Sequence, residues 1–274
     1  MTIREALSEA AGVLDEAGCP SPQADAEWLL AHVLGRSRTQ LHLNGIAVSR
    51  EDLGRFRELL ARRARREPLA YILGEWGFRR LTLAVDPRVL IPRPETEIVV
   101  ERCLALLQGV REPTVLDVGV GSGAIALAIA DERPDSRVVG TDASRGALEV
   151  AEENRKRAAI DGRVSFVHGD LVAGEPGPFD LVVSNPPYVS AGELPGLEPE
   201  LRYEPREALV GEGGHEAVAT AAREALAPGA PLVLEVGDGQ AASVARLLTS
   251  LGYGDVRISQ DLAGCERVVD GRRP

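Results

Sequence analysis

The first part of the chain carries apolar side chains at the three- and four-residue spacing of amphipathic helices. Ser21-Pro22 then places an N-cap residue before a proline at the first helical position. A further helix is expected to begin at Ser49, with Phe56 on its inner face. The pattern predicts a small helical bundle from residue 2 to about residue 66. The first apolar positions are Ile3, Ala6, Leu7, Ala10, Val13 and Leu14.

The spacing of apolar positions changes after this bundle. Between residues 71 and 90 they alternate with polar ones, which predicts a β-hairpin. Helical spacing resumes after Pro94. We therefore expect a helical domain over residues 1–70, a hairpin linker over residues 71–92 and a larger domain over residues 93–274.

Beyond residue 111, short apolar runs typical of buried strands alternate with helical patterns. This alternation predicts an α/β fold with a mainly parallel, doubly wound sheet that helices cover on both faces. In such a sheet, ligands bind beyond the carboxyl ends of the strands. Strands are expected near residues 115–118, 138–141, 164–167, 181–184 and 232–236, followed by 256–258 and 266–269.

The charge is unevenly distributed along the chain. The formal net charge is −11, but residues 1–90 carry 13 Arg against 12 acidic residues, so the excess of acid lies in the larger domain. An acidic domain without a basic stripe is poorly suited to gripping a phosphate backbone, although a DNA substrate stays open. The exposed side of the helix after Ser49 carries a basic run that is either a solvated face, which is the commoner case, or a docking site: Arg55, Arg57, Arg62, Arg63, Arg65 and Arg66.

The cysteines and histidines are scattered. Cys19, Cys103 and Cys265 form no Cys-x-x-Cys pair, so we expect ordinary thiols in a reducing compartment and no metal site. Four histidines, at positions 32, 42, 168 and 215, indicate neither a metal centre nor a catalytic triad. No stretch reaches the roughly 20 apolar residues needed to cross a bilayer, and no signal core is present, so a cytoplasmic protein is expected.

A glycine-rich turn joins the strand at residues 115–118 to a helical run. Glycines let the backbone approach a ligand closely, and the helix start offers free N–H groups. Asp142 closes the next strand about 20 residues on, where a carboxylate can accept both ribose hydroxyls. A purely structural tight turn is the alternative. The turn consists of Gly119, Val120, Gly121, Ser122 and Gly123.

The acidic residues around this turn favour a cationic cofactor. The turn reads Gly-x-Gly-x-Gly rather than the dinucleotide pattern Gly-x-Gly-x-x-Gly. Asp117, just before it, would repel a pyrophosphate but suits the sulfonium of S-adenosyl-L-methionine, which it could reach through water. Asp170 is either an acceptor for the adenine amino group or a helix N-cap, and Leu171 follows it.

The run Asn185-Pro186-Pro187-Tyr188 ends a strand and suggests chemistry on a planar –NH2 group. The Asn185 side-chain oxygen and the Pro186 carbonyl can each accept one N–H, which aims the nitrogen lone pair away from the protein. Both prolines fix φ, so these acceptors are pre-oriented, and Tyr188 can stack on the flat group. The alternative is a strand that merely ends in a proline turn.

Six motifs are spread along nearly the whole chain. They are Arg66-Glu67-Pro68-Leu69-Ala70-Tyr71-Ile72-Leu73-Gly74, Leu90-Ile91-Pro92-Arg93-Pro94-Glu95-Thr96-Glu97, the glycine turn, Ser184 to Tyr188, Tyr203-Glu204-Pro205-Arg206-Glu207-Ala208-Leu209 and Asp261-Leu262-Ala263-Gly264. Together they resemble one family, the protein-(glutamine-N5) methyltransferases of peptide chain release factors, also called the PrmC/HemK family. Asn-Pro-Pro-Tyr alone also occurs in DNA adenine and other amino methyltransferases, but its combination with the other motifs is more specific.

The resemblance implies a Rossmann-like class I methyltransferase domain that uses S-adenosyl-L-methionine and releases S-adenosyl-L-homocysteine. The implied substrate is the glutamine of a Gly-Gly-Gln motif in a class 1 release factor, recognised with help from the helical domain in translation termination. Cofactor contacts carry over to the glycine turn, Asp142 and Asn185, and substrate contacts to Asn185 through Tyr188. No metal, membrane or direct nucleic-acid partner is implied, and a monomer is expected.

The chain departs from the family pattern at Leu171, where relatives often carry an aromatic residue, and at Glu212-Gly213-Gly214, where an Asp-Gly pair is commoner. Arg93, Glu95 and Glu97 either close over the cofactor or form a capped helix start. Three other functions are weighed: a nucleic-acid amino (adenine N6) methyltransferase, an NAD-dependent oxidoreductase, and a docking protein with a vestigial pocket. Acidic charge counts against the first, and loop spacing against the second.

Overall fold

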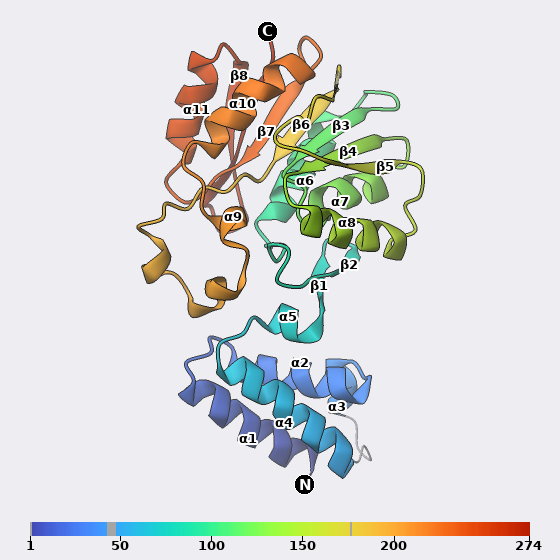
Figure 1. Ribbon diagram of the computed structural model, residues 1–274, viewed down its shortest axis with the longest axis vertical. Coiled ribbons are helices and arrows are strands. Elements are labelled where there is room, and N and C mark those ends of the chain that lie inside the picture. The colour runs from blue at the N-terminus through green and yellow to red at the C-terminus, as the bar shows by residue number, and fades with distance from the viewer. Residues whose placement is uncertain (1, 43–47, 176) are drawn as a thin grey trace. The chain divides into compact units, whose positions relative to one another are not determined.

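The computed structural model describes residues 2–42, 48–175 and 177–274. The chain forms two compact units (Figure 1), one of Met1–Gly74 with Glu198–Tyr203 and the other of Glu75–Leu197 with Glu204–Pro274. Part of the predicted helical span, residues 43–47, lies outside the described residues.

The smaller unit is a bundle of helices whose apolar faces meet in one core. Leu14, Leu29 and Phe56 are at most 2% exposed and belong to this core. Ser49 Oγ accepts a hydrogen bond from the Asp52 amide at 3.0 Å, so Ser49 caps its helix as the sequence predicts. The described helices are α1 (Ile3–Glu16), α2 (Pro22–Leu34), α3 (Arg38–Leu41), α4 (Arg50–Ala64) and α5 (Leu69–Leu73), with the 3-10 turn η2 (Pro199–Tyr203).

The basic run on α4 is only partly the solvated face that its spacing predicts. Arg55 and Arg57 are exposed, but the Arg63 side chain is only 4% exposed, and its Nε donates to Asp25 Oδ2 at 2.7 Å. The prediction is therefore wrong for Arg63. Burial of this guanidinium depends on partners that are distant in sequence, and helical spacing carries no information about them.

A short hairpin opens the larger unit, and it begins later than predicted. Residues 69–73 form α5 rather than a strand, because Gly74 has a φ of 75° and ends that turn as a left-handed C-cap. The strands are β1 (Glu75–Phe78) and β2 (Leu81–Ala84), which pair antiparallel. The hairpin prediction is confirmed, with a start at Glu75 rather than at Tyr71.

The larger unit contains a seven-stranded sheet in the order β5-β4-β3-β6-β7-β9-β8. The five strands from β5 to β7 run parallel, and β9 is antiparallel to both its neighbours. The predicted doubly wound α/β fold is therefore confirmed. The strands are β3 (Thr114–Val118), β4 (Arg137–Asp142), β5 (Val164–His168), β6 (Leu181–Ser184), β7 (Pro231–Glu235), β8 (Gly254–Gln260) and β9 (Glu266–Arg272).

Successive side chains on each central strand pack alternately into two hydrophobic cores, one on each face of the sheet. On β6, Leu181 and Val183 pack into the core that contains α6 and α7, whereas Val182 packs into the core with α10 and α11. Figure 1 shows these helices on opposite faces of the sheet. The helices are α6 (Thr96–Leu106), α7 (Ala124–Glu132), α8 (Arg145–Arg157), α9 (Arg206–Leu209), α10 (Gly214–Ala225) and α11 (Ala241–Ser250), with the 3-10 turn η1 (Leu194–Gly196).

Strand β3 lies between β4 and β6, so the winding direction reverses on its two sides. At such a switch point the loops after the two parallel strands diverge and leave a crevice beyond their carboxyl ends. The glycine turn follows β3, and Asn185 follows β6. The topology thus brings both predicted motifs to one edge of the sheet.

Candidate active site

A cavity of about 360 Å³ lies at this edge, within the larger unit. It joins the glycine turn after β3, Asp142 at the end of β4 and the proline run after β6. Residues that the sequence did not single out for the cavity complete its wall, among them Arg88, Ser144, Pro205, Glu207, Ala208, Ala217 and Val218. Two sequence motifs separated by some 60 residues therefore share one pocket.

The glycine turn is shaped by left-handed backbone conformations and by hydrogen bonds to β4. Gly119 and Gly121 line the cavity with φ values of 75° and 53°, which residues with a side chain adopt at a cost. The Gly119 amide donates to the Thr141 carbonyl at 2.8 Å, and the Gly121 amide donates to Asp142 Oδ2 at 2.9 Å. The turn and Asp142 are therefore held together before any ligand binds.

The Asp142 carboxylate accepts two hydrogen bonds from backbone amides and can still accept more from a ligand. Its Oδ1 accepts a hydrogen bond from the Ser144 amide at 2.8 Å, in addition to the bond from Gly121. Burial raises the pKa of Asp142, and the two backbone amides counteract that effect. Because a carboxylate offers about four lone-pair sites, both oxygens can still accept from a diol that enters the cavity.

Asp117 lies beneath the glycine turn rather than in the described cavity wall. Its side chain is almost fully buried, Oδ2 accepts from the Ala126 amide at 3.0 Å, and Oδ1 has no hydrogen-bond partner among the described residues. Burial raises the pKa of Asp117 to about 7. The carboxyl group thus anchors the first turn of α7, and its predicted contact with a cofactor stays a prediction.

The other members of the turn face away from the cavity. Val120 packs into the core, and a Cβ atom on Gly123 would lie 3.0 Å from Leu127. The Ser122 carbonyl accepts a hydrogen bond from Asn154 Nδ2 at 2.9 Å. These three residues therefore support the turn in this structure, and their predicted cofactor contacts remain predictions.

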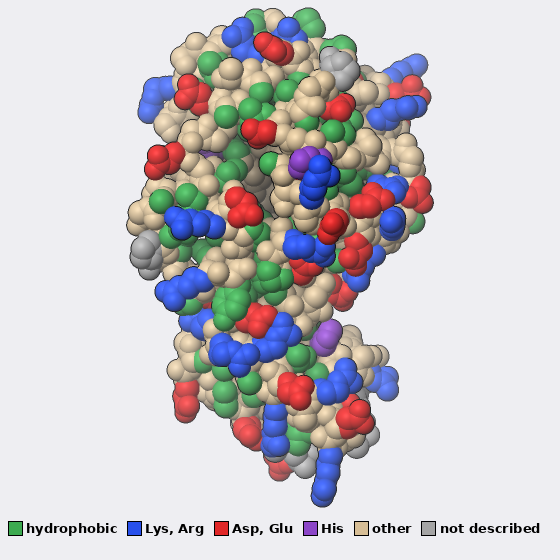
Figure 2. Space-filling model, viewed as in Figure 1, with side chains coloured by type: hydrophobic (Ala, Val, Ile, Leu, Met, Phe, Trp, Pro, Cys, Tyr) green, Lys and Arg blue, Asp and Glu red, His purple; other side chains and the backbone are tan. Residues whose placement is uncertain are grey.

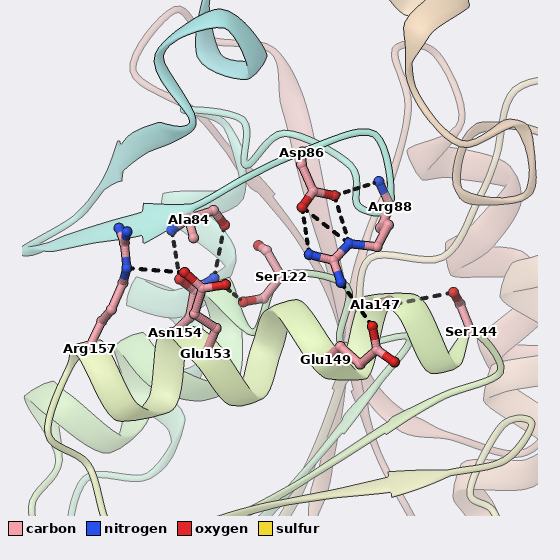
Figure 3. A network of polar contacts seen from close by, with 10 residues as sticks. All are labelled: Ala84, Asp86, Arg88, Ser122, Ser144, Ala147, Glu149, Glu153, Asn154 and Arg157. Atoms are coloured by element: carbon pink, nitrogen blue, oxygen red, sulfur yellow. Dashed lines mark hydrogen bonds and ion pairs between the residues drawn. The ribbon is translucent and has the colours of Figure 1, made fainter. Parts of the chain in front are cut away.

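Asn154, on α8, fastens the glycine turn to the hairpin (Figure 3). Its side chain is fully buried; Oδ1 accepts from the Ala84 amide at 2.6 Å, and Nδ2 donates to the Ala84 carbonyl at 3.0 Å and to the Ser122 carbonyl. Sequence reasoning missed this residue because it stands among charged residues of an amphipathic helix. Its only sequence signal is a polar side chain at the helical spacing of buried Val150 and Ala151.

Asp170 and Leu171 both line the cavity. Asp170 Oδ1 accepts from the Leu171 amide at 2.9 Å, and the Leu171 carbonyl accepts from Thr141 Oγ1 at 2.6 Å. Residues 171–174 form a turn and no helix begins there, so the interpretation of Asp170 as a helix N-cap is wrong. Leu171 supplies a partly buried apolar wall with a φ of 49°.

The proline run lies across the cavity from the glycine turn. Asn185, Pro186 and Pro187 line it, and the Asn185 amide makes no hydrogen bond to the part of the chain that the structure describes. Close packing holds the run in place, because a Cβ atom on Gly211 would lie 2.7 Å from the Pro187 carbonyl oxygen. A Cβ atom on Gly214, at the start of α10, would lie 2.8 Å from the same oxygen. Residues 212–214 depart from the family pattern, but they keep a glycine at the position where a side chain would clash.

Tyr188 stands behind the proline run, against a histidine that sequence reasoning missed. The rings of Tyr188 and His215 are stacked, and Gln240 Nε2 donates to the Tyr188 carbonyl at 3.1 Å. His215 Nε2 lies 2.9 Å from the Glu235 carbonyl oxygen, and burial lowers the pKa of His215. Tyr188 is not among the described residues of the cavity wall, so its stacking on a substrate remains a prediction.

The charged residues before α6 are bound within the protein. Arg93 forms an ion pair with the buried carboxylate of Glu204, and Glu97 Oε1 accepts from the Arg79 amide at 2.9 Å. Glu95 occupies the N-cap position without a capping bond from its side chain. None of the three belongs to the described cavity wall, which favours their structural interpretation.

Three further observations concern metal ligands, membrane spans and surface charge. The described residues contain no group of three or more His, Cys, Asp or Glu side chains placed to hold a metal ion. Among the same residues, no helix is long and apolar enough to cross a membrane. On the face shown in Figure 2, basic and acidic side chains are interspersed rather than separated by sign.

Comparison with known proteins supplies the family. Residues 5–74 match the PrmC N-terminal domain and residues 97–228 the methyltransferase small domain. Release factor glutamine methyltransferases of Geobacter sulfurreducens and Deinococcus radiodurans are 43% and 42% identical, over 99% and 100% of this chain and 96% and 99% of theirs. A Thermus thermophilus 16S rRNA methyltransferase (TM-score 0.56, 21% identity, 73% of this chain and 50% of that one) shares the fold alone. The chain therefore belongs to the release factor glutamine methyltransferase family.

Proposed function

We propose that the protein transfers a methyl group from S-adenosyl-L-methionine to the side-chain amide nitrogen of the glutamine in the Gly-Gly-Gln motif of a class 1 release factor. One observation carries this function most directly: a single cavity joins the glycine turn and Asp142 to the amide of Asn185, which has no hydrogen-bond partner among the described residues. The family to which the chain belongs supports the same substrate.

The residues of the cavity fit S-adenosyl-L-methionine. Asp142 has acceptor sites left for the ribose hydroxyls, Asp170 offers an acceptor to the adenine amino group, and Leu171 gives an apolar wall for the ring. The backbone of Gly119 and Gly121 borders the space for the rest of the cofactor, which would supply an electrophilic methyl group on its sulfonium. We also propose that Asp117, Val120, Ser122 and Gly123 act on the cofactor mainly by holding this turn.

The proline run would orient the substrate amide. Asn185 Oδ1 and the Pro186 carbonyl accept the two N–H groups, which draws the lone pair back onto nitrogen and aims it into the cavity. Pro187 and Tyr188 fix the run through Gly211 and His215. The bound cofactor would supply the methyl group to this nitrogen and leave as S-adenosyl-L-homocysteine, and the proton that the nitrogen loses would pass to water.

We assign substrate recognition to the helical domain, with residues 1–70 as that domain, residues 71–92 as the linker and residues 93–274 as the transferase domain. The enzyme is proposed to work in the cytoplasm as a monomer, on a protein rather than a nucleic acid. Its net charge of −11 supports a protein substrate, because nucleic-acid binding draws on basic surface.

The test uses purified protein, labelled S-adenosyl-L-methionine and two forms of a class 1 release factor, one of which carries Gln→Ala in the Gly-Gly-Gln motif. Label is expected only in the factor that keeps the glutamine, and mass spectrometry should place the added methyl on that residue. Equal labelling of both factors would contradict the proposal. Label in adenine of a duplex, and none in protein, would favour the nucleic-acid alternative.

A further inference from the structure

The segment Glu198–Tyr203 follows the proline run in sequence but belongs to the helical unit. Glu200 fastens it there: Oε1 accepts from Arg63 Nη1 at 2.8 Å, and both carboxylate oxygens accept from Arg66 at 2.7 Å. Arg63 also donates to Asp25 and is nearly inaccessible to solvent. A buried guanidinium between two carboxylates requires this geometry, because removal of one partner leaves an uncompensated charge.

Arg66 occupies a backbone position that favours glycine. It follows the C-terminus of α4 with a φ of 65°, in the left-handed region where a side chain costs about 1 kcal/mol. The chain places a long cationic side chain there, and the paired hydrogen bonds to Glu200 offset the strain. The backbone conformation of Arg66 and its hydrogen bonds to Glu200 together fix the position of the guanidinium group.

This arrangement leaves a cationic hollow on the helical unit. It has a volume of about 360 Å³ and is lined by Arg65, Arg66, Pro199, Arg202 and Tyr203. The Tyr203 hydroxyl donates to the Arg65 carbonyl at 3.0 Å, which holds its ring in the wall. Arg65 and Arg202 are exposed, and neither forms an ion pair within the described part of the chain.

The charges around the hollow do not balance. Asp25 and Glu200 are engaged with Arg63 and Arg66, so the guanidinium groups of Arg65 and Arg202 are left without a carboxylate. Two free guanidinium groups beside an aromatic ring match a carboxylate on a protein surface, which they can bind through paired hydrogen bonds.

We propose that this hollow is a docking site for an acidic side chain of the protein substrate, outside the catalytic cavity. The inference rests on the proposed function, because it takes the release factor as the partner. The role of this site is recognition. The contact between the two arginines and the acidic side chain strengthens binding of the folded factor and fixes its orientation, and it takes no part in methyl transfer.

The experiment measures binding and transfer separately. Affinity for a full-length class 1 release factor is titrated by calorimetry with S-adenosyl-L-homocysteine present, for the wild type, Arg65→Ala/Arg202→Ala and Arg65→Gln/Arg202→Gln. Both double variants are expected to weaken binding roughly three- to tenfold at low salt. The difference should shrink at about 0.5 M salt, where exposed charges are screened. Cofactor affinity and kcat should not change.

The matched control is Arg55→Ala/Arg57→Ala, which removes two exposed arginines of α4 that do not line the hollow. If the control weakens binding equally, the effect comes from net charge alone and the docking site is overturned. Wild-type affinity in both hollow variants would also overturn it. A factor that binds normally but receives no methyl group contradicts the proposed function, while the binding data still test the hollow. Tighter binding of a single-stranded RNA than of the factor, lost in the hollow variants, would reassign the site to phosphate.

Discussion

The rings of His215 and Tyr188 lie nearly parallel, with 6.3 Å between their centroids and 15° between their planes. His215 lies at the start of α10, and its Nε2 is within hydrogen-bond distance of the Glu235 carbonyl at the end of β7. The Tyr188 ring, at the end of the proline run, is therefore positioned through His215 by the end of strand β7. This places His215 behind the proline run, and His215 is not among the described residues that line the cavity.

His215→Ala should reduce kcat several-fold, because an aromatic pair contributes about 0.5–1.5 kcal/mol and its loss frees Tyr188 to move. His215→Phe keeps the stacked ring and should retain most of the activity, although it leaves the Glu235 carbonyl without its bond. The measurement is single-turnover transfer beside the dissociation constant for S-adenosyl-L-homocysteine, which should not change. If His215→Ala weakens cofactor binding as strongly as it slows transfer, its role is not confined to Tyr188.

Asn154→Ala is expected to destabilise the larger unit by about 2–4 kcal/mol, because it removes three hydrogen bonds from a buried site and leaves backbone groups unpaired. Affinity for the cofactor should also fall, since the Ser122 carbonyl loses its anchor. Glu153→Ala, on the same helix turn (Figure 3), is the control. Glu153 is half exposed and forms an exposed i,i+4 ion pair with Arg157, so a change below about 0.5 kcal/mol is expected. Chemical denaturation and calorimetry measure the two effects.

The elements and both motif loops were predictable because they depend on local patterns. Strand β6 could be predicted from the apolar run Leu181 to Val183, and the cavity from two loops after parallel strands. Contacts between side chains distant in sequence were not predictable. No pattern singles out Asn154, His215 is one of four scattered histidines, and helical spacing predicts Arg63 as a solvated charge, because burial of each is decided by tertiary packing.

Gly211→Ala should slow transfer more than it weakens cofactor binding. A Cβ atom at this position would lie 2.7 Å from both the Pro187 ring and the Pro187 carbonyl oxygen, so the proline run must shift. A displacement of about 1 Å at a positioning residue can reduce the rate about a hundredfold. Gly254→Ala, where a Cβ atom meets nothing within 4 Å, is the control and should leave kcat at the wild-type value. Similar losses in both variants would point to general destabilisation.

The buried carboxyl of Asp117 predicts an unusual dependence of stability on pH. Burial raises its pKa from 3.8 to about 7, so the folded state holds a proton that the unfolded state releases above about pH 4. This contribution to stability is therefore full at low pH and falls as pH rises from about 4 to 7, by up to about 1.4 kcal/mol for each pH unit.

Asp117→Asn should remove this slope, because the side-chain oxygen can still accept from the Ala126 amide while no proton is released. The free energy of unfolding, measured between about pH 4 and pH 8 for both proteins, tests the sign. Glu235, whose pKa burial also raises to about 7, should give a residual slope of the same sign in the variant. The difference between the two proteins isolates Asp117, because carboxylates whose pKa is lowered, such as Glu132 and Glu200, give both proteins a slope of the opposite sign. A difference that does not change with pH would show that Asp117 is ionised in the fold.

Asn185→Ala gives the sharpest test of how the amide is activated. The Asn185 side chain lines the cavity without a hydrogen-bond partner in the described part of the chain, so its removal should perturb the fold by less than about 1 kcal/mol. If its oxygen holds an N–H of the substrate while the lone pair forms the new bond, the interaction strengthens in the transition state, and kcat should fall by about a hundredfold or more. Cofactor affinity should fall much less. Asn185→Asp keeps one acceptor oxygen and should recover part of the rate, whereas Asn185→Leu should not. An Asn185→Ala enzyme with normal kcat and a raised KM would show that Asn185 contributes uniform binding, and lone-pair orientation would then have to come from the Pro186 carbonyl alone.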